Sequence, residues 1–93
     1  MKSTKTITKS GTIRYHNYKS QLHREDGPAV EWTNGNKFWY FNGQWHRLDG
    51  PAIECTDGYK SWWIEGKKYT ETGWQDHPLV FKEKLRKLLA AID

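Results

Sequence analysis

The sequence predicts a mostly β protein, an antiparallel meander of tandem β-hairpin repeats that ends in one C-terminal amphipathic α-helix. Three observations support this prediction: a 23-residue internal repeat, turn dipeptides such as Asn-Gly at short intervals, and an apolar stripe of helical period near the C-terminus. A chain of 93 residues and 11.0 kDa is long enough for one small domain. We divide it into a basic arm (residues 1–10), hairpin repeats (residues 11–74) and a helix (residues 76–93).

Composition excludes several classes of protein. Aromatic residues make up 15% of the chain although its mean hydropathy is −0.99, and disordered chains are poor in aromatics. No apolar run approaches the ~18 residues of a membrane span, and the N-terminal residues lack the apolar stretch of a secretory signal. Cys55 is the single cysteine, which excludes an internal disulfide and a cysteine-ligated zinc site. We therefore expect a cytoplasmic protein with no membrane partner.

The net charge of +4 is concentrated towards the ends of the chain. Residues 1–14 carry basic charges and no acidic residue, whereas residues 15–74 carry seven basic and eight acidic residues, a net charge of −1. Such a balanced middle segment is a poor electrostatic footprint for nucleic acid.

Residues 27–49 and 50–72 are two copies of one 23-residue unit, and residues 11–24 form a degenerate earlier copy. The motif His23-Arg24-x-Asp26 precedes the first full unit as His46-Arg47-x-Asp49 precedes the second. Nine of the 23 positions are identical: Gly27/Gly50, Pro28/Pro51, Ala29/Ala52, Glu31/Glu54, Thr33/Thr56, Gly35/Gly58, Lys37/Lys60, Trp39/Trp62 and Gly43/Gly66. A fixed period of this length is typical of a repeat array with atypical ends.

Each unit is predicted to contain three short strands. In the first unit they are Ala29–Thr33, Lys37–Phe41 and Gln44–Arg47. Asn34-Gly35 and Asn42-Gly43 separate them, and both dipeptides favour the positive φ of a type I′ hairpin turn. The corresponding turns of the second unit are Asp57-Gly58 and Glu65-Gly66. Strands this short, joined by turns, predict a meander of about six to eight strands.

Alternation along the strands assigns side chains to two faces. The repeated Trp39 and Trp62 are predicted to form the core, and their partners in this prediction are Phe41, Ile64, Val30 and Ile53. A domain of this size cannot bury its remaining aromatics. We therefore expect an exposed or dimer-buried patch that binds a protein partner and contains Phe38, Tyr40, Trp45, Trp63 and Trp74.

The C-terminal segment is predicted to be helical. Asp76-His77-Pro78 has the features of a helix start, with Asp76 as the N-cap and Pro78 in the first turn. An apolar stripe follows at steps of three and four residues: Phe81, Leu85, Leu88, Leu89 and Ile92. We expect this stripe to dock on the sheet, with self-association into a homo-oligomer as the alternative.

The two His-Arg-x-Asp motifs have two interpretations. In the first, His23, Arg24 and Asp26, with their counterparts His46, Arg47 and Asp49, form repeated anion or phosphate sites. In the second, each Asp accepts backbone N–H groups at the Asp-Gly-Pro turn and each Arg pairs with Glu31 or Glu54. We favour the second, because recurrence in every unit is what a structural role requires.

The repeated unit consists of His-Arg-x-Asp-Gly-Pro-Ala, then Gly, then Trp-Tyr or Trp-Trp, and then Gly. This unit resembles MORN-like hairpin repeats. It is similar to a repeat found in small accessory proteins of tailed bacteriophages and giant viruses. The resemblance covers residues 11–72. It implies a hairpin array with an aromatic spine, no catalytic residue and no single ligand, and it suggests a host-directed role.

No catalytic constellation is recognisable in the sequence. None of the four histidines forms a helical i, i+4 pair, and Cys55 replaces Trp32 of the preceding unit, as a small buried hydrophobe would. Every glycine fits a turn, so no phosphate-binding loop is indicated. We expect no enzymatic activity, no cofactor and no metal.

The expected function is therefore a non-enzymatic protein-binding module. Its most specific form is a phage-encoded accessory protein that binds and inhibits a host defence or toxin protein in the host cytoplasm. One alternative is a nucleic-acid-binding protein that uses the basic arm, Lys37, Lys60, Tyr40 and Trp63. A second alternative is a protein that sequesters a small molecule or nucleotide.

Overall fold

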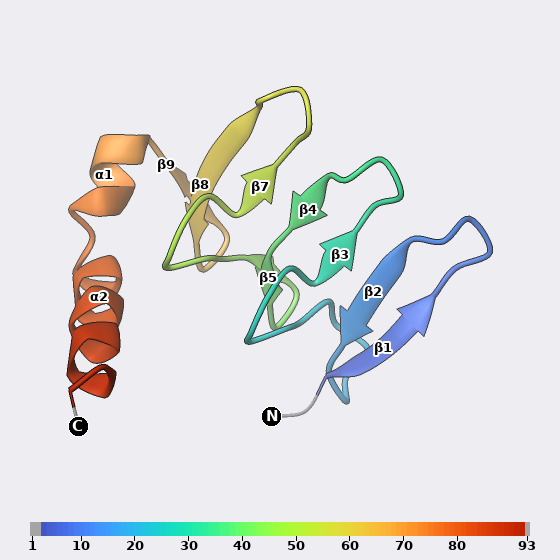
Figure 1. The fold of residues 1–93 in the computed structure, drawn as a ribbon, viewed down its shortest axis with the longest axis horizontal. Helices are drawn as coiled ribbons and strands as arrows, with labels where there is room; N and C mark the ends of the chain where they lie inside the picture. Colours follow the sequence, from blue (N-terminus) through green and yellow to red (C-terminus); the bar gives the residue numbers. More distant parts are fainter. Residues whose placement is uncertain (1–2, 93) are drawn as a thin grey trace.

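A computed structural model describes residues 3–92, which form short strands followed by two helices (Figure 1). The elements are β1 (Thr4–Ile7), β2 (Ile13–His16), β3 (Val30–Glu31), β4 (Lys37–Phe38), β5 (Tyr40–Phe41), β6 (Gln44–Trp45), β7 (Ile53–Glu54), β8 (Lys60–Ile64), β9 (Lys67–Tyr69), α1 (Glu71–Gln75) and α2 (Pro78–Ala90). Seven strands form one antiparallel sheet in the order β1-β2-β3-β4-β7-β8-β9, and β5 pairs with β6. The predicted class, a mostly β antiparallel meander with a C-terminal helix, is confirmed.

Three hairpins, β1–β2, β3–β4 and β7–β8, lie side by side along the long axis, and the helices lie beyond β9 at one end (Figure 1). The prediction of a separate basic arm is wrong, because Thr4–Ile7 pairs with Ile13–His16 as an edge strand. The loop between them closes by Gly11 N donating to Thr8 O at 2.9 Å. The loop of the next hairpin closes in the same way, from Gly35 N to Trp32 O at 2.9 Å.

The turns divide into two kinds. Type I′ geometry is confirmed at Asn42-Gly43, with φ of 49° and 81°, and at Glu65-Gly66, with φ of 51° and 81°. It is wrong at Asn34-Gly35, where positive φ belongs to the glycine alone, at 97°. There Asn34 Oδ1 accepts the N–H of Asn36 at 3.0 Å, and the longer loop needs a left-handed residue at one position only. Asp57-Gly58 repeats this arrangement, with Tyr59 as the donor to Asp57.

The predicted strand Lys37–Phe41 is interrupted at Trp39. The backbone N–H of Trp39 donates to Ala52 O at 2.7 Å, whereas its carbonyl accepts from His46 N at 3.1 Å. Trp39 therefore joins the main sheet on one side to the β5–β6 hairpin on the other. The chain leaves the main sheet at this residue, which is why β4 and β5 are separate.

Cross-strand partners define two faces. One row of directly opposite residues crosses β3, β4, β7 and β8 and shares one face: Val30, Phe38, Ile53 and Ser61. The adjacent row, on the other face, is Glu31, Lys37, Glu54 and Lys60. We call these the aromatic face and the charged face. Val30 and Ile53 thus share the face of Phe38, and the prediction that grouped them with Trp39 is wrong, because parity within a strand does not determine the register between strands.

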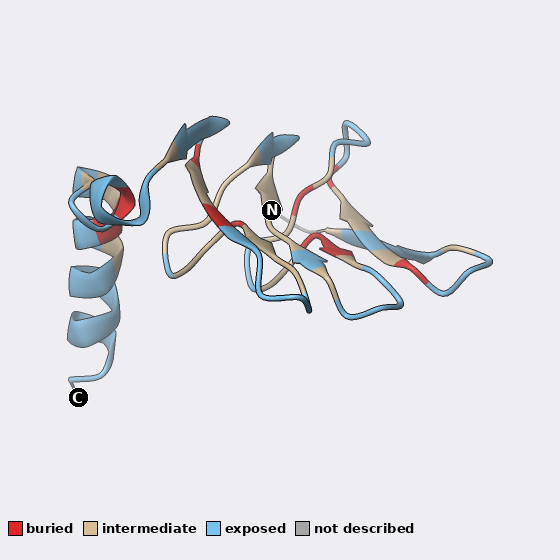
Figure 2. Cartoon of the chain, turned by 90° about the horizontal axis from the view of Figure 1, so that it is seen from above, coloured by how far each residue is buried: buried red, intermediate tan, exposed pale blue. Residues whose placement is uncertain are grey.

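The main cluster of the hydrophobic core lies where the helices meet the end of the sheet, and further buried residues follow along the stack at Ala29, Val30 and Ala52 (Figure 2). Ile64, Trp74 and Val80 form its buried centre, and the half-buried Leu48, Trp62, Tyr69 and Leu79 pack against them. The predicted core is therefore only partly correct. Ile64 and Val30 are buried, whereas Trp39, Trp62, Phe41 and Ile53 are half-buried.

The helical segment differs from the prediction at both its start and its packing. Asp76 is the C-cap of α1, and its N–H donates to the carbonyls of Thr72 and Trp74. The N-cap of α2 is therefore His77, whose Nδ1 accepts the N–H of Leu79 at 3.1 Å. Docking of the predicted stripe on the sheet is wrong. Its five side chains are exposed to between 46% and 71%: Phe81, Leu85, Leu88, Leu89 and Ile92. The first turn of α2 reaches the core instead, through Leu79 and Val80.

The position of the core predicts the effect of two truncations. Ile64→Ala should lower the free energy of unfolding by about 2–5 kcal/mol, since it leaves a cavity in the buried cluster. Leu88→Ala, on the exposed stripe, should change it by less than about 0.5 kcal/mol at low protein concentration. Urea unfolding followed by tryptophan fluorescence measures both, and an equal loss for the two variants would contradict this assignment of the core.

Candidate functional site

Each His-Arg-x-Asp motif forms a clamp around its arginine. In the second motif, Arg47 Nε donates to Asp49 Oδ1 at 2.7 Å, and Nη1 donates to the carbonyl of Pro51 at 3.0 Å and to Glu54 Oε1 at 3.2 Å. The guanidinium carbon also lies 3.7 Å from the ring centroid of Trp39, a cation–π distance. The clamp therefore fastens the aromatic ring, the turn and the next strand to one side chain.

The first motif repeats this geometry 23 residues earlier. Arg24 Nε donates to Asp26 Oδ1 at 2.9 Å, and Nη1 donates to Pro28 O at 3.2 Å and to Glu31 Oε2 at 3.5 Å. Its guanidinium lies 4.0 Å from the ring centroid of Tyr15. The predicted pairing of each Arg with a Glu is confirmed, whereas the bond from each Arg to its Asp was not predicted. The contacts of both guanidinium groups favour the structural interpretation of the motif.

The aspartates of the two clamps are held in their charged forms. A hydrogen bond from Arg24 and the charge of its guanidinium lower the pKa of Asp26. Desolvation raises the pKa of Asp49, but hydrogen bonds from Arg47 and Lys87 outweigh it, so that this pKa also lies below its ordinary value. Both aspartates therefore remain ionised partners of their arginines at neutral pH.

The glycine of each Asp-Gly-Pro turn makes room for the arginine. A Cβ at Gly27 would lie 2.9 Å from Arg24 Cζ, and one at Gly50 would lie 2.8 Å from Arg47 Cζ. Contacts this short would displace the guanidinium from its partners. Glycine is thus required at these two positions because a larger side chain would occupy the space of the guanidinium group.

The histidines of the motifs connect one hairpin to the next. His23 Nδ1 accepts the N–H of Asn42 at 2.9 Å, and His46 Nδ1 accepts the N–H of Glu65 at 3.0 Å. Asn42 and Glu65 are the first residues of the two type I′ turns, whose N–H groups point back towards the preceding unit. Each bond requires an unprotonated Nδ1. The histidines are therefore structural acceptors that hold successive units in register.

Four of the five residues predicted to bind a protein partner lie together on the aromatic face. With Trp32 they form a continuous set of ring contacts, which we call the aromatic row: Trp32, Phe38, Tyr40, Trp45 and Trp63. The ring centroids of Tyr40 and Trp45 lie 4.3 Å apart in a stacked arrangement, and those of Phe38 and Trp45 lie 5.1 Å apart edge to face. Trp32 extends the row from Phe38 at 5.8 Å, and Trp63 extends it from Trp45 at 6.0 Å.

Two corrections to the predicted patch follow. Trp74 is buried, and its Nε1 donates to Arg47 O at 2.9 Å, so it belongs to the core and not to a binding surface. Trp32 was missed, although it is 39% exposed. Its position differs between the units, Trp32 against Cys55, and the same signal identified Phe38 against Ser61.

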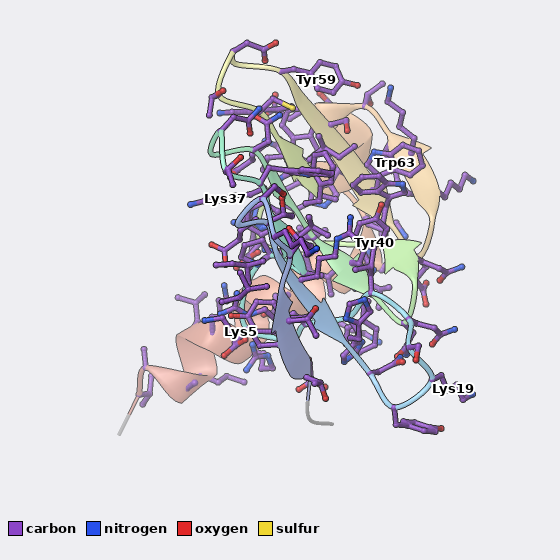
Figure 3. All side chains as sticks on the ribbon, turned by 90° about the vertical axis from the view of Figure 1, so that its right-hand side faces the viewer. Lys5, Lys19, Lys37, Tyr40, Tyr59 and Trp63 are labelled. Carbon is purple, nitrogen blue, oxygen red and sulfur yellow. The ribbon has the colours of Figure 1, made fainter. Side chains whose placement is uncertain are left out.

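The aromatic row is held in place and its rings are half-exposed. Trp63 Nε1 donates to Ser61 Oγ at 2.9 Å, which fixes the indole on β8. Desolvation raises the pKa of Tyr40, so its hydroxyl stays protonated. Figure 3 shows Tyr40 and Trp63 on one side of the ribbon, with Lys5 and Lys37 on the other. The row is thus separated from the lysines of the charged face.

A cleft of about 710 Å³ lies between the charged face and α2. Trp39, His46 and Arg47 line it from the sheet, and Arg86 and Lys87 line it from the helix. Both helix cations are paired, Arg86 with Glu83 at 2.7 Å and Lys87 with Asp49 at 3.0 Å. The cleft therefore offers a set of compensated charges. Within residues 3–92, no group of three or more His, Cys, Asp or Glu side chains is placed to hold a metal ion.

Comparisons of the chain with protein-family models, with curated proteins and with solved structures gave no match. The resemblance to MORN-like repeats thus remains a prediction from the motif. In the part of the chain that the structure describes, no helix is both long and apolar enough to cross a membrane.

The clamp geometry predicts that Arg47 cannot be replaced by lysine. Arg47→Lys keeps the charge but cannot donate simultaneously from Nε and Nη1, so we expect a loss of about 1–3 kcal/mol in the free energy of unfolding. Arg14→Lys, at an exposed position of β2, is the matched control and should change it by less than about 0.5 kcal/mol. Equal effects of the two substitutions in urea unfolding would refute the clamp.

The bond to His46 predicts a dependence of stability on pH. Burial lowers the pKa of His46; the Glu65 carboxylate opposes this shift and His77 adds to it. As the pH falls below about 6.5, His46 is protonated in the unfolded chain before it is protonated in the folded one. The stability that the neutral imidazole contributes is therefore lost as the pH falls from about 6.5 to the pKa of His46 in the folded chain. His46→Asn keeps an acceptor that does not titrate, so the variant should lose less stability than the wild type between about pH 7 and 5. Parallel stability curves for the two proteins would contradict the role of His46.

Proposed function

We propose that the chain is a non-enzymatic protein-binding module and that the aromatic row is its binding surface. The single observation that carries this proposal is the continuity of five half-exposed or exposed rings on one face, in which Trp45 contacts Phe38, Tyr40 and Trp63, and Phe38 contacts Trp32. Large aromatic side chains concentrate binding energy at protein interfaces because they bury much area with few rotatable bonds. The complementary partner surface is apolar and presents a hydrogen-bond acceptor to the indole of Trp32, since the indole of Trp63 already donates to Ser61.

The placement of charge favours a protein over a nucleic acid as the partner. Aromatic rings on a sheet can stack with bases, but such sites combine the rings with cations that follow the phosphates. Lys37 lies on the opposite face from Tyr40 (Figure 3), and its cross-strand partners are Glu31 and Glu54. The basic charge of β1 is on that same face, at Lys5 (Figure 3). Lys5 and Lys37 of the nucleic-acid alternative thus lie away from the row, which leaves Arg14, opposite Val30, and Lys68, opposite Trp63, as the strand cations that share its face.

The more specific proposal, inhibition of a host defence or toxin protein, rests on the resemblance of the motif to accessory proteins of phages and giant viruses. The fold is consistent with such a role, since a small repeat scaffold can present a rigid surface without a catalytic site.

A capture experiment with matched variants tests the proposal. The tagged chain is incubated with bacterial lysate, with and without nuclease, and bound protein is identified by mass spectrometry. We expect a discrete partner that resists nuclease and is lost by about 10-fold or more with Trp45→Ala, which removes the ring at the centre of the row. Tyr18→Ala, at an aromatic that is 81% exposed and outside the row, should leave capture unchanged.

Three results would count against this function. Recovery of nucleic acid alone, with binding that weakens steeply with salt, would favour the nucleic-acid alternative. A partner that Trp45→Ala retains would place the binding surface elsewhere. Recovery of neither protein nor nucleic acid would favour a small molecule bound in the cleft beside α2.

A further inference from the structure

The exposed stripe at α2 holds five of the nine large hydrophobic side chains that are exposed in the described part of the chain. Four of its side chains lie on α2, and Ile92 follows the C-cap Ala91. The helix is attached to the rest of the fold at its first turn, through Leu79 and Val80, and on the side opposite the stripe, where Lys87 bonds to Asp49. Such a stripe on a short helix indicates an interface rather than a solvated surface.

Four of the five stripe residues are spaced symmetrically about one point of the helix, and the fifth, Leu89, has Lys84 as its counterpart. Phe81 and Ile92 lie equally far from the midpoint between Arg86 and Lys87, and Leu85 and Leu88 lie equally far from it as well. Two identical helices that run antiparallel about a two-fold axis at this height therefore place Leu85 opposite Leu88 of the second copy. Phe81 then lies opposite the residues just after the C-cap Ala91, where Ile92 is. A surface that complements itself in this way is what a two-fold dimer requires.

We propose that the chain forms a homodimer through an antiparallel pair of α2 helices. The partner of the stripe is a second copy, because the apolar residues match one another and the charges beside them are also compatible. Arg86 and Lys87 point away from the seam, where they bond to Glu83 and Asp49. They do not meet the second copy, so the pairing requires no burial of these charges.

The two lysines that border the stripe support the antiparallel orientation. Antiparallel pairing places Lys84 beside Leu89 of the second copy and Lys82 beside Ala91, so that the methylene groups of each lysine cover an apolar neighbour. It also places both lysines near the negative end of the partner's helix dipole. A parallel pair would gather Lys82 and Lys84 of both copies at one end of the seam, where like charges repel. The charges thus select one of the two possible orientations.

A seam of about three helical turns is smaller than a standard stable interface of ~1,600 Å², so we expect dissociation in the micromolar range. Sedimentation equilibrium over low-micromolar to submillimolar concentrations should show a monomer–dimer equilibrium. Leu88→Glu buries a charge at the centre of the seam and should weaken the dimer by about 100-fold or more. Ala90→Glu introduces the same charge on the side of α2 opposite the stripe and should change the dissociation constant of the dimer by less than about 3-fold. Far-UV circular dichroism should confirm that both variants fold.

A wild-type chain that stays monomeric throughout this range would overturn the proposal, and so would a dimer that survives Leu88→Glu. Single cysteines test the orientation in a Cys55→Ser background. Leu85→Cys and Leu88→Cys chains, one of them tagged, should form a mixed disulfide in preference to either homodimer. Efficient disulfide formation by each chain alone would indicate a parallel pair and reject the antiparallel arrangement.

Discussion

The arginine clamp is the interaction on which the rest of the fold depends. A chain of this size buries few side chains: its main apolar cluster lies at the end next to the helices, and the other buried hydrophobic residues among those described are Ala29, Val30 and Ala52. Along the rest of the stack, Arg24 and Arg47 each connect an aromatic ring, an Asp-Gly-Pro turn and a glutamate of the following strand. Charge-assisted hydrogen bonds are stronger than neutral ones, and a planar guanidinium can make several at once. Repetition of this polar contact thus replaces a continuous hydrophobic core.

The end of the stack shows what happens when the clamp is absent. One period after Arg47 the residue is Thr70, and its hydroxyl accepts the N–H of Gly73 at 3.0 Å as the N-cap of α1. This helix carries Trp74 into the core, where its indole bonds to the carbonyl of Arg47. The last unit is therefore closed by a helix instead of a further hairpin, as terminal units of repeat proteins commonly are.

The sequence predicted the elements whose signals are local. Turn dipeptides and the 23-residue period identified the hairpins, and the spacing of apolar residues identified α2. Three features depended on contacts between distant residues. The strand Thr4–Ile7 has no apolar alternation of its own, the face of Val30 depends on its register with Phe38, and burial of Trp74 depends on where α1 packs. The aromatic row was largely predicted, because parity within strands grouped Phe38, Tyr40 and Trp63 and because Trp45 differs from its counterpart Lys68.

The same comparison of units separates scaffold from surface. The arginine clamp, its turn and the histidine that joins hairpins use positions that match between the two motifs. The aromatic row uses positions that differ: Trp32 against Cys55, Phe38 against Ser61 and Trp45 against Lys68. The second unit forms the same β-hairpin with Cys55 and Ser61 at the positions of Trp32 and Phe38, so the repeat itself does not require large rings there. The proposed binding surface accounts for their concentration in the first unit, beside Trp63 of the second.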